Sequence, residues 1–412
     1  MARFRLRLAG YLESVATDEL IDWSTAETTA RRLVRPGPAV SQRQAEAAVA
    51  ELRRSARAAQ GHVRTFTKLE VAEDDAPVLV VDRPGWINAN IEAVQQLSAP
   101  LAEKVHQWRE GVDPSGLRWA TEALGAKLTG VELGSLLAYL SHRILGQYDP
   151  FGLGPNGGGR LLLVAPNIVR VERELGLDPA DFRLWVCLHE ETHRVQFGSV
   201  PWLRDHILGE IGTLIAELEV EPTVFVDRIR DVVRSAVGAA TGSASPPRPD
   251  TDPSGAPEST RHAEEAADRV GDDAPPVTPP RRLSLLDVVR TPAQRVVIER
   301  LTAVMTLLEG HATYVMDGVG PLVVPSVAEI SREFARRRSR NRLGPEGLLR
   351  RVLGLDAKMR QYRDGERFVR RVVDEAGIDG FNRVWTSPNT LPTQAEIQDP
   401  AAWIRRVPLR RG

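Results

Sequence analysis

The chain has 412 residues, of which 42% are hydrophobic and 26% are charged, a profile typical of a globular protein with two or three domains. Its formal net charge of -1 gives no overall attraction to nucleic acid or to an anionic membrane. The single cysteine, Cys187, excludes an intrachain disulfide and a zinc site built from several thiolates. No window approaches the roughly 20 apolar residues of a membrane helix, and the N-terminus lacks the apolar core of a signal peptide. We therefore expect a soluble, cytoplasmic protein.

Residues 1–130 are expected to form an N-terminal helical region. Residues 25–33 and 41–59 are rich in Ala, Arg and Glu, and Ser41 stands where an N-cap is needed. A further helix follows Pro84-Gly85-Trp86.

The next region, residues 131–236, is expected to combine helices with one short strand. Residues 133–145 have the apolar spacing of a helix that ends at Gly146, and a turn-rich stretch follows over 148–159. Residues 160–165 (RLLLVA), bounded by Gly and Pro, are the best strand candidate in the chain. This strand is either an edge that binds extended peptide or an ordinary buried strand. The sequence thus predicts a mainly α fold with a small β element.

Residues 237–282 are predicted to be a disordered linker or insertion. They are rich in Pro, Gly, Ser, Asp and Ala, so they bury too little apolar surface to offset the entropy of ordering. The remaining residues, 283–412, are expected to form a C-terminal helical region. Its basic stretch, 332–371, is interspersed with acidic residues, which favours solvated helix faces over a nucleic-acid surface.

The helix predicted over residues 178–198 carries the clearest chemical motif. Asp178 suits the N-cap and Gly198 the C-terminal cap. Between them lies His189-Glu190-Glu191-Thr192-His193, an H-E-x-x-H motif. Residues four apart share a helix face, so both imidazoles can reach one ion. Glu190 is rotated by about 100° around the helix from His189, so it is placed to act as general base on a metal-bound water instead of as a ligand. The motif predicts one Zn²⁺ ion with an open position for water or substrate.

The competing interpretation of this motif is a solvated or salt-bridged helix face with two incidental histidines. Glu191 favours that interpretation, because protease versions usually have uncharged residues between the Glu and the second His. The position of the motif inside a well-capped, largely apolar helix favours the metal site.

A zinc site needs a third protein ligand, which we expect from the helix predicted over residues 291–318. The extended H-E-x-x-H-x-x-G-x-x-H motif is excluded, since Gln196 and Ser199 stand at its Gly and last His positions. Glu309 is the preferred ligand, because a carboxylate in an apolar helix is costly to bury without a partner. His311 is the alternative; the two lie about 200° apart around the helix, so both cannot face one ion.

Other polar residues near these helices have weaker expected roles. Whichever of Glu309 and His311 is not a ligand can support one from behind. Tyr314 and Tyr148 could each donate to a developing oxyanion, although a packed tyrosine is the commoner situation. Asp317 could orient a ligand histidine. The small Gly310 and Ala312 would let another helix approach closely.

Eight stretches in this order, spread over nearly the whole chain outside the linker, resemble one family: DWSTAETTARRLVRPGP, VDRPGWINANIEAV, LGQYDPF, LLLVAPNI, LHEETHRVQF, LLEGHATYVMDGV, GLDAKMRQYRDGERFV and LPTQAEIQDPAAW. It is the zincin-like group of zinc metalloproteases found in actinobacteria and relatives, whose members often carry a label linking them to biosynthesis of a deazaflavin coenzyme. The resemblance implies a mainly helical zincin-like fold. It also implies metal ligands at His189 and His193, a catalytic carboxylate at Glu190 and a third ligand at Glu309.

Two functions of different class follow from these residues. The first is a zinc-dependent hydrolase, most simply a peptidase, in which Glu190 deprotonates the attacking water and passes the proton to the leaving amine. Its partner would be a peptide or protein substrate, with no role for nucleic acid or membrane. The second is a catalytically silent zincin scaffold that binds a partner around a structural metal. Glu190 favours the enzyme, because a structural site does not need it.

Overall fold

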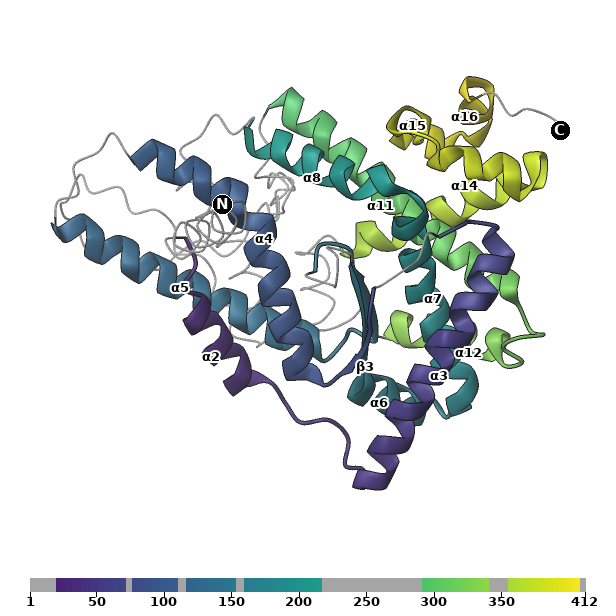
Figure 1. The fold of residues 1–412 in the computed structure, drawn as a ribbon, viewed down its shortest axis with the longest axis horizontal. Coiled ribbons are helices and arrows are strands. Elements are labelled where there is room, and N and C mark those ends of the chain that lie inside the picture. The colour runs from purple at the N-terminus through teal and green to yellow at the C-terminus, as the bar shows by residue number, and fades with distance from the viewer. Residues whose placement is uncertain are drawn as a thin grey trace, which may run out of the picture.

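The computed structural model describes residues 20–71, 76–109, 116–152, 159–216, 291–340 and 355–407. These residues form a helical protein around one small sheet (Figure 1). The predicted linker, 237–282, lies outside the described residues. The elements in chain order are α2 (Trp23–Leu33), α3 (Gln42–Thr67), β1 (Val78–Val81), α4 (Arg83–Arg109), α5 (Gly116–Ser141), β2 (Gly146–Asp149), β3 (Arg160–Val164), α6 (Ala165–Leu175), α7 (Pro179–Ser199), α8 (Pro201–Ala216), α11 (Pro292–Val319), α12 (Val327–Arg340), α14 (Leu355–Phe381), two short 3₁₀ turns η2 (Asn382–Trp385) and η3 (Pro388–Thr390), α15 (Gln394–Gln398) and α16 (Pro400–Arg406).

The sheet has three strands in the order β1-β3-β2. β3 lies in the centre, parallel to β1 and antiparallel to β2. All five residues of β3 are buried, because helices cover both faces of the sheet. Leu161 and Leu163 face the core shared with α3 and α7, whereas Leu162 and Val164 face the core shared with α2, α4 and α5. The unbroken apolar run of β3 is thus the pattern expected of a strand buried on both sides.

The predicted strand over 160–165 is therefore confirmed, but as the central strand and not as an edge open to a peptide. The edge beside it is β2, which begins at Gly146, where the helix was predicted to end, and runs into the stretch predicted as turns, 148–159. The preceding helix also ends earlier than predicted, at Ser141 instead of Gly146. β2 has the sequence Gly-Gln-Tyr-Asp, which carries neither alternation nor β-branched residues, so only its pairing with β3 makes it a strand.

Several predicted helix starts are confirmed. Ser41 and Gln44 form a capping box at the start of α3, and Asp178 caps α7 by accepting hydrogen bonds from the N–H groups of Ala180 and Asp181. The predicted ends were less accurate. α7 continues through Gly198 to Ser199, where the closely packed Val71 leaves no room for a side chain on that glycine.

Two cores place the C-terminal helices against α7, and the first is the core that contains Leu161 and Leu163 of β3. Val186, Leu188 and Val195 of α7 pack in one core with α3 and with Val315 of α11. A separate core joins α8, the first half of α11, α14 and the segments that follow it, around Trp403. α11 contributes to both cores, and it packs against α7 and α14, which lie near it in Figure 1. Segments more than 100 residues apart in sequence are thereby packed side by side.

Within the described residues, no helix combines the length and the hydropathy needed to cross a bilayer.

Candidate metal centre

The histidines of the H-E-x-x-H motif lie in the middle of α7, where the helix is well defined from its capped start. Their imidazole rings are 4.8 Å apart between centroids, and the two Nε2 atoms approach to 3.3 Å. The one-turn spacing alone places both rings on the same face.

The third side chain of the site comes from the middle of α11, at Glu309. A capping box of Thr291 and Gln294 starts this helix. The neighbouring residue Gly310 touches α14: a Cβ atom at this position would lie 2.2 Å from the carbonyl carbon of Gly365. The close helix approach predicted from Gly310 is therefore confirmed, and it lies one residue from Glu309.

His189, His193 and Glu309 converge on one point. The Glu309 Oε2 atom lies 3.6 Å from His189 Nε2 and 3.7 Å from His193 Nε2, and one possible ligand atom from each residue falls within 4.8 Å of the others. Three ligands of a tetrahedral zinc ion, with bonds near 2.0–2.1 Å, are separated from one another by about 3.3 Å. The donor types and their spacing fit a zinc ion.

The cluster is only partly shielded from solvent. The side chain of His189 is 26% exposed, and those of His193 and Glu309 are 14% and 13% exposed. Burial by itself lowers the pKa of His193, but the Glu309 carboxylate outweighs this effect and raises the pKa above its ordinary value. The exposed side leaves access for a further ligand.

Glu190 lies beside the cluster and is buried. Its Oε2 atom accepts a hydrogen bond from the backbone N–H of Tyr148 in β2, at 3.1 Å. Gly146, also in β2, packs so closely that a Cβ atom there would lie 2.6 Å from Cγ of Glu190. Burial raises the pKa of Glu190 to about 7, and the nearby Glu309 carboxylate adds to this rise. The edge strand thus confines a carboxyl group whose ionisation falls near neutral pH.

Glu191, which favoured a solvated helix face in the sequence, is fully buried. Its carboxylate accepts hydrogen bonds from Arg194 Nη1, at 3.2 and 3.5 Å. The two charges compensate each other within α7, on a side of the helix away from solvent. The extra acid in the motif therefore does not turn this face of α7 toward water.

Sequence reasoning did not identify the residues that contact the two imidazoles from behind. His189 Nδ1 lies 3.1 Å from the sulfur of Met316, and His193 Nδ1 lies 2.9 Å from Oε1 of Gln196. The only signal for Gln196 was its position three residues after His193 on an apolar helix. Met316 gave none, because a methionine in a helix is most often part of a core.

Of the alternative residues, His311 does not join the cluster. It is fully buried, its Nδ1 atom lies 2.9 Å from Nε2 of Gln196, and its ring packs against Phe381 and Trp385. Burial lowers the pKa of His311 to about 3, so the ring is neutral. Among the described residues it is Glu309, not His311, that approaches the two histidines.

The remaining candidates lie outside the cluster. Tyr314 packs against Phe66 with Arg370 over its ring, and burial raises the pKa of its hydroxyl. Asp317 is exposed and its described contact is an ion pair with Arg370, not a bond to a histidine. The ring of Tyr148 packs against Phe197, and its backbone N–H contacts the site through Glu190.

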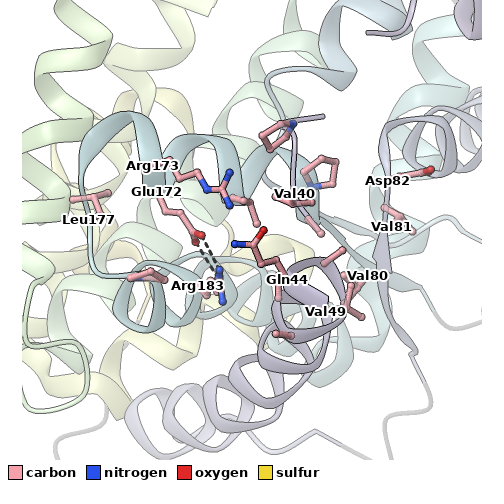
Figure 2. A pocket seen from close by; sticks show the side chains of 18 of the residues that line it. Val40, Gln44, Val49, Val80, Val81, Asp82, Glu172, Arg173, Leu177 and Arg183 are labelled. Carbon is pink, nitrogen blue, oxygen red and sulfur yellow. Dashed lines mark hydrogen bonds and ion pairs between the residues drawn. The ribbon is translucent and has the colours of Figure 1, made fainter. Parts of the chain in front are cut away.

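A pocket of about 760 Å³ lies elsewhere, between α3, the end of β1 and α6 (Figure 2). Its walls are mainly apolar, and Arg183 and Glu172 at its edge hydrogen-bond to each other. None of the residues of the metal cluster lines it.

Comparison with known proteins agrees with this geometry. The family model for zincin-like metallopeptidases matches residues 21–404. A crystal structure from Chloroflexus aurantiacus, of a protein assigned as a hydrolase with a novel fold, is similar with 29% sequence identity and a TM-score of 0.59. The similarity covers 95% of this chain and all of that one. No protein with a curated description matches significantly.

Proposed function

The chain belongs to the zincin-like metallopeptidase family, and on this basis we propose that it is a zinc-dependent peptidase. The observation that carries the proposal is the convergence of His189, His193 and Glu309 from two helices, at separations that suit one zinc ion. A zinc ion in this position would acidify a water and polarise a substrate carbonyl. The family and the similar hydrolase support hydrolysis in general, and the peptide substrate is our inference.

Glu190 is the proposed general base. Its pKa of about 7 suits a group that must take a proton from water and then give it to a leaving amine near neutral pH. The hydrogen bond from Tyr148 N–H and the contact with Gly146 hold the carboxyl group at the edge of β2. The same restraint would keep its free oxygen directed at the water.

The outer edge of β2 is the proposed support for an extended substrate. In an antiparallel pair, residues alternate between those that exchange hydrogen bonds with the partner strand and those that do not. Val164 N–H donates to the carbonyl of Leu145, so the backbone groups of Gly146 and Tyr148 face away from β3. The outward N–H of Tyr148 already donates to Glu190, so a peptide would pair with the outward backbone groups of Gly146 and would run past Glu190. β2 would thus be the edge strand that binds extended peptide, the role that the sequence suggested for residues 160–165.

The test compares Glu190→Gln with the wild type, using zinc content and cleavage of a mixed peptide library followed by mass spectrometry. We expect one zinc per chain in both proteins and a loss of about 100- to 10,000-fold in cleavage rate for Glu190→Gln. Absence of stoichiometric zinc in the wild type would reject the metal site. Equal cleavage by both proteins would reject Glu190 as base. Stoichiometric zinc without cleavage of any peptide would favour the silent scaffold.

The cytoplasmic location, the absence of nucleic-acid and membrane partners, and the link to a deazaflavin coenzyme and to actinobacteria all stay predictions. The division of the chain into regions that end at residues 130, 236 and 282 also stays a prediction.

A further inference from the structure

Gln196 is a fully buried polar residue that connects the two ligand-bearing helices. It lies one turn after His193 on α7, and its side chain makes three contacts. Oε1 lies 2.9 Å from Nδ1 of His193, and Nε2 lies 3.0 Å from the carbonyl oxygen of Leu308 and 2.9 Å from Nδ1 of His311. Leu308 and His311 flank Glu309 on α11, so one amide reaches from a ligand on α7 to the turn that carries the third ligand.

The orientation of this amide follows from the Leu308 carbonyl. A backbone carbonyl oxygen can only accept a hydrogen bond, so the amide atom facing it must be the NH₂ group. The other atom, Oε1, then faces His193 and can only accept. His193 Nδ1 must therefore carry a proton. In the neutral ring the unprotonated nitrogen is then Nε2, the atom that faces His189 and Glu309.

His311 completes the arrangement. The second hydrogen of the Gln196 amide points at Nδ1 of His311, which must accept and so is unprotonated. The His311 ring is held in place by Phe381 and Trp385. Both amide hydrogens thus have a fixed acceptor, and rotating the amide would lose two hydrogen bonds and place NH₂ against the N–H of His193.

We propose that Gln196 is a positioning residue of the metal centre, which uses the Leu308 carbonyl and His311 to hold His193 in the tautomer that presents Nε2 to the ion. This inference rests on the proposed zinc site and adds that the site is organised before the ion arrives. The same amide sets the spacing between α7 and the Glu309 turn. His311 accordingly supports a ligand without contacting the ion.

The test uses Gln196→Met, which keeps the length of the side chain but removes the acceptor and both donors. We expect zinc affinity, measured by competition with a chelator, to fall about 10- to 100-fold. In the zinc-free protein, at a pH where the His193 ring is neutral, ¹⁵N imidazole NMR should show His193 losing its single Nδ1–H tautomer. Gln294→Met is the matched control, because Gln294 is also buried but caps the start of α11; both readouts should stay at wild-type values.

A second variant covers the case in which Gln196→Met does not fold. His311→Phe removes one acceptor while leaving Gln196 and all three ligands unchanged, and it should weaken zinc binding about 3- to 10-fold. Wild-type affinity in these variants would overturn the proposal. Weaker zinc binding with an unchanged His193 tautomer would also overturn it, because that result indicates packing alone. If the wild type itself binds no zinc, the proposed function fails, and the NMR readout still tests the hydrogen-bonded arrangement.

Discussion

Helix α7 takes part in two clusters of polar groups that differ in how their charges are compensated. Near its start, Arg183 donates two hydrogen bonds to Glu172, at 2.9 and 2.7 Å, and one to Glu51, at 2.9 Å. We call these three residues the closed cluster; Figure 2 shows two of them at the edge of the pocket. At the middle of α7, the ligand cluster of His189, His193 and Glu309 contains one carboxylate and two imidazoles.

The hydrogen-bond donors in each cluster explain why the closed cluster is structural and the ligand cluster is suited to a metal ion. The guanidinium of Arg183 supplies donors that match its two carboxylates in number and direction. In the ligand cluster, three electron-pair donors face one another at 3.3–3.7 Å, and a divalent cation would satisfy them all at once. Four changes should break or sharpen this contrast, and they are taken here from the largest expected effect to the smallest.

Glu309→Ala should reduce zinc affinity at least about 1,000-fold, equivalent to about 4 kcal/mol, because two histidines alone do not make a stable zinc site. Chelator competition measures the affinity directly. Glu299→Ala, on the exposed part of the same helix, is the control and should bind zinc as the wild type does. Near-normal affinity in Glu309→Ala would mean that another group supplies the third ligand.

Arg183→Met should lower the free energy of unfolding by about 3 kcal/mol while leaving zinc stoichiometry unchanged. The substitution leaves Glu172 buried without its partner, and an uncompensated buried charge is strongly destabilising. Arg300→Met is the control, since the Arg300–Glu210 pair is partly exposed and should contribute less than about 1 kcal/mol. Urea unfolding measures both. Loss of zinc in Arg183→Met would show that the two clusters are not independent.

The pH dependence of stability should separate Glu190 from the closed cluster. Its folded-state pKa of about 7 lies above the ordinary value of 4.5, so the folded state favours the protonated form, and the associated stability is lost as pH rises from 4.5 through 7. We therefore compare the free energies of unfolding of zinc-free Glu190→Gln and zinc-free wild type. Their difference should change in favour of Glu190→Gln by on the order of 2 to 3 kcal/mol as the pH rises from 4 to 8. Unfolding curves at several pH values give this difference. A difference that does not change with pH would contradict the expectation.

Gly310→Ala should destabilise the protein by about 1 to 2 kcal/mol and weaken zinc binding a few-fold, because a Cβ atom there meets the backbone of Gly365 and pushes α11 away from α14. The control is Gly209→Ala in α8, where a Cβ atom meets nothing within 4 Å and the change should be neutral or stabilising. Thermal unfolding with and without zinc measures both effects. Equal behaviour of the two variants would show that the close helix contact does not determine the position of Glu309.

The sequence by itself determined the parts of the protein that depend on neighbours along the chain. The caps of α3, α7 and α11, the extended conformation of β3 and the shared face of His189 and His193 all follow from interactions within about one turn of helix or one strand. Helical spacing also separated Glu309 from His311 before any contact was known. These features were predictable because local geometry allows few alternatives.

Only the tertiary structure decided the rest. Glu309 faces the histidines because α11 packs against α7 and, through Gly310, against α14. β2 is a strand because β3 pairs with it, and Gln196 acquires its role from groups more than 100 residues away. Such contacts join segments that are distant in sequence, and the sequence of one segment does not indicate which other segment it will contact. The contacts stabilise the protein only once the cores have brought the helices together.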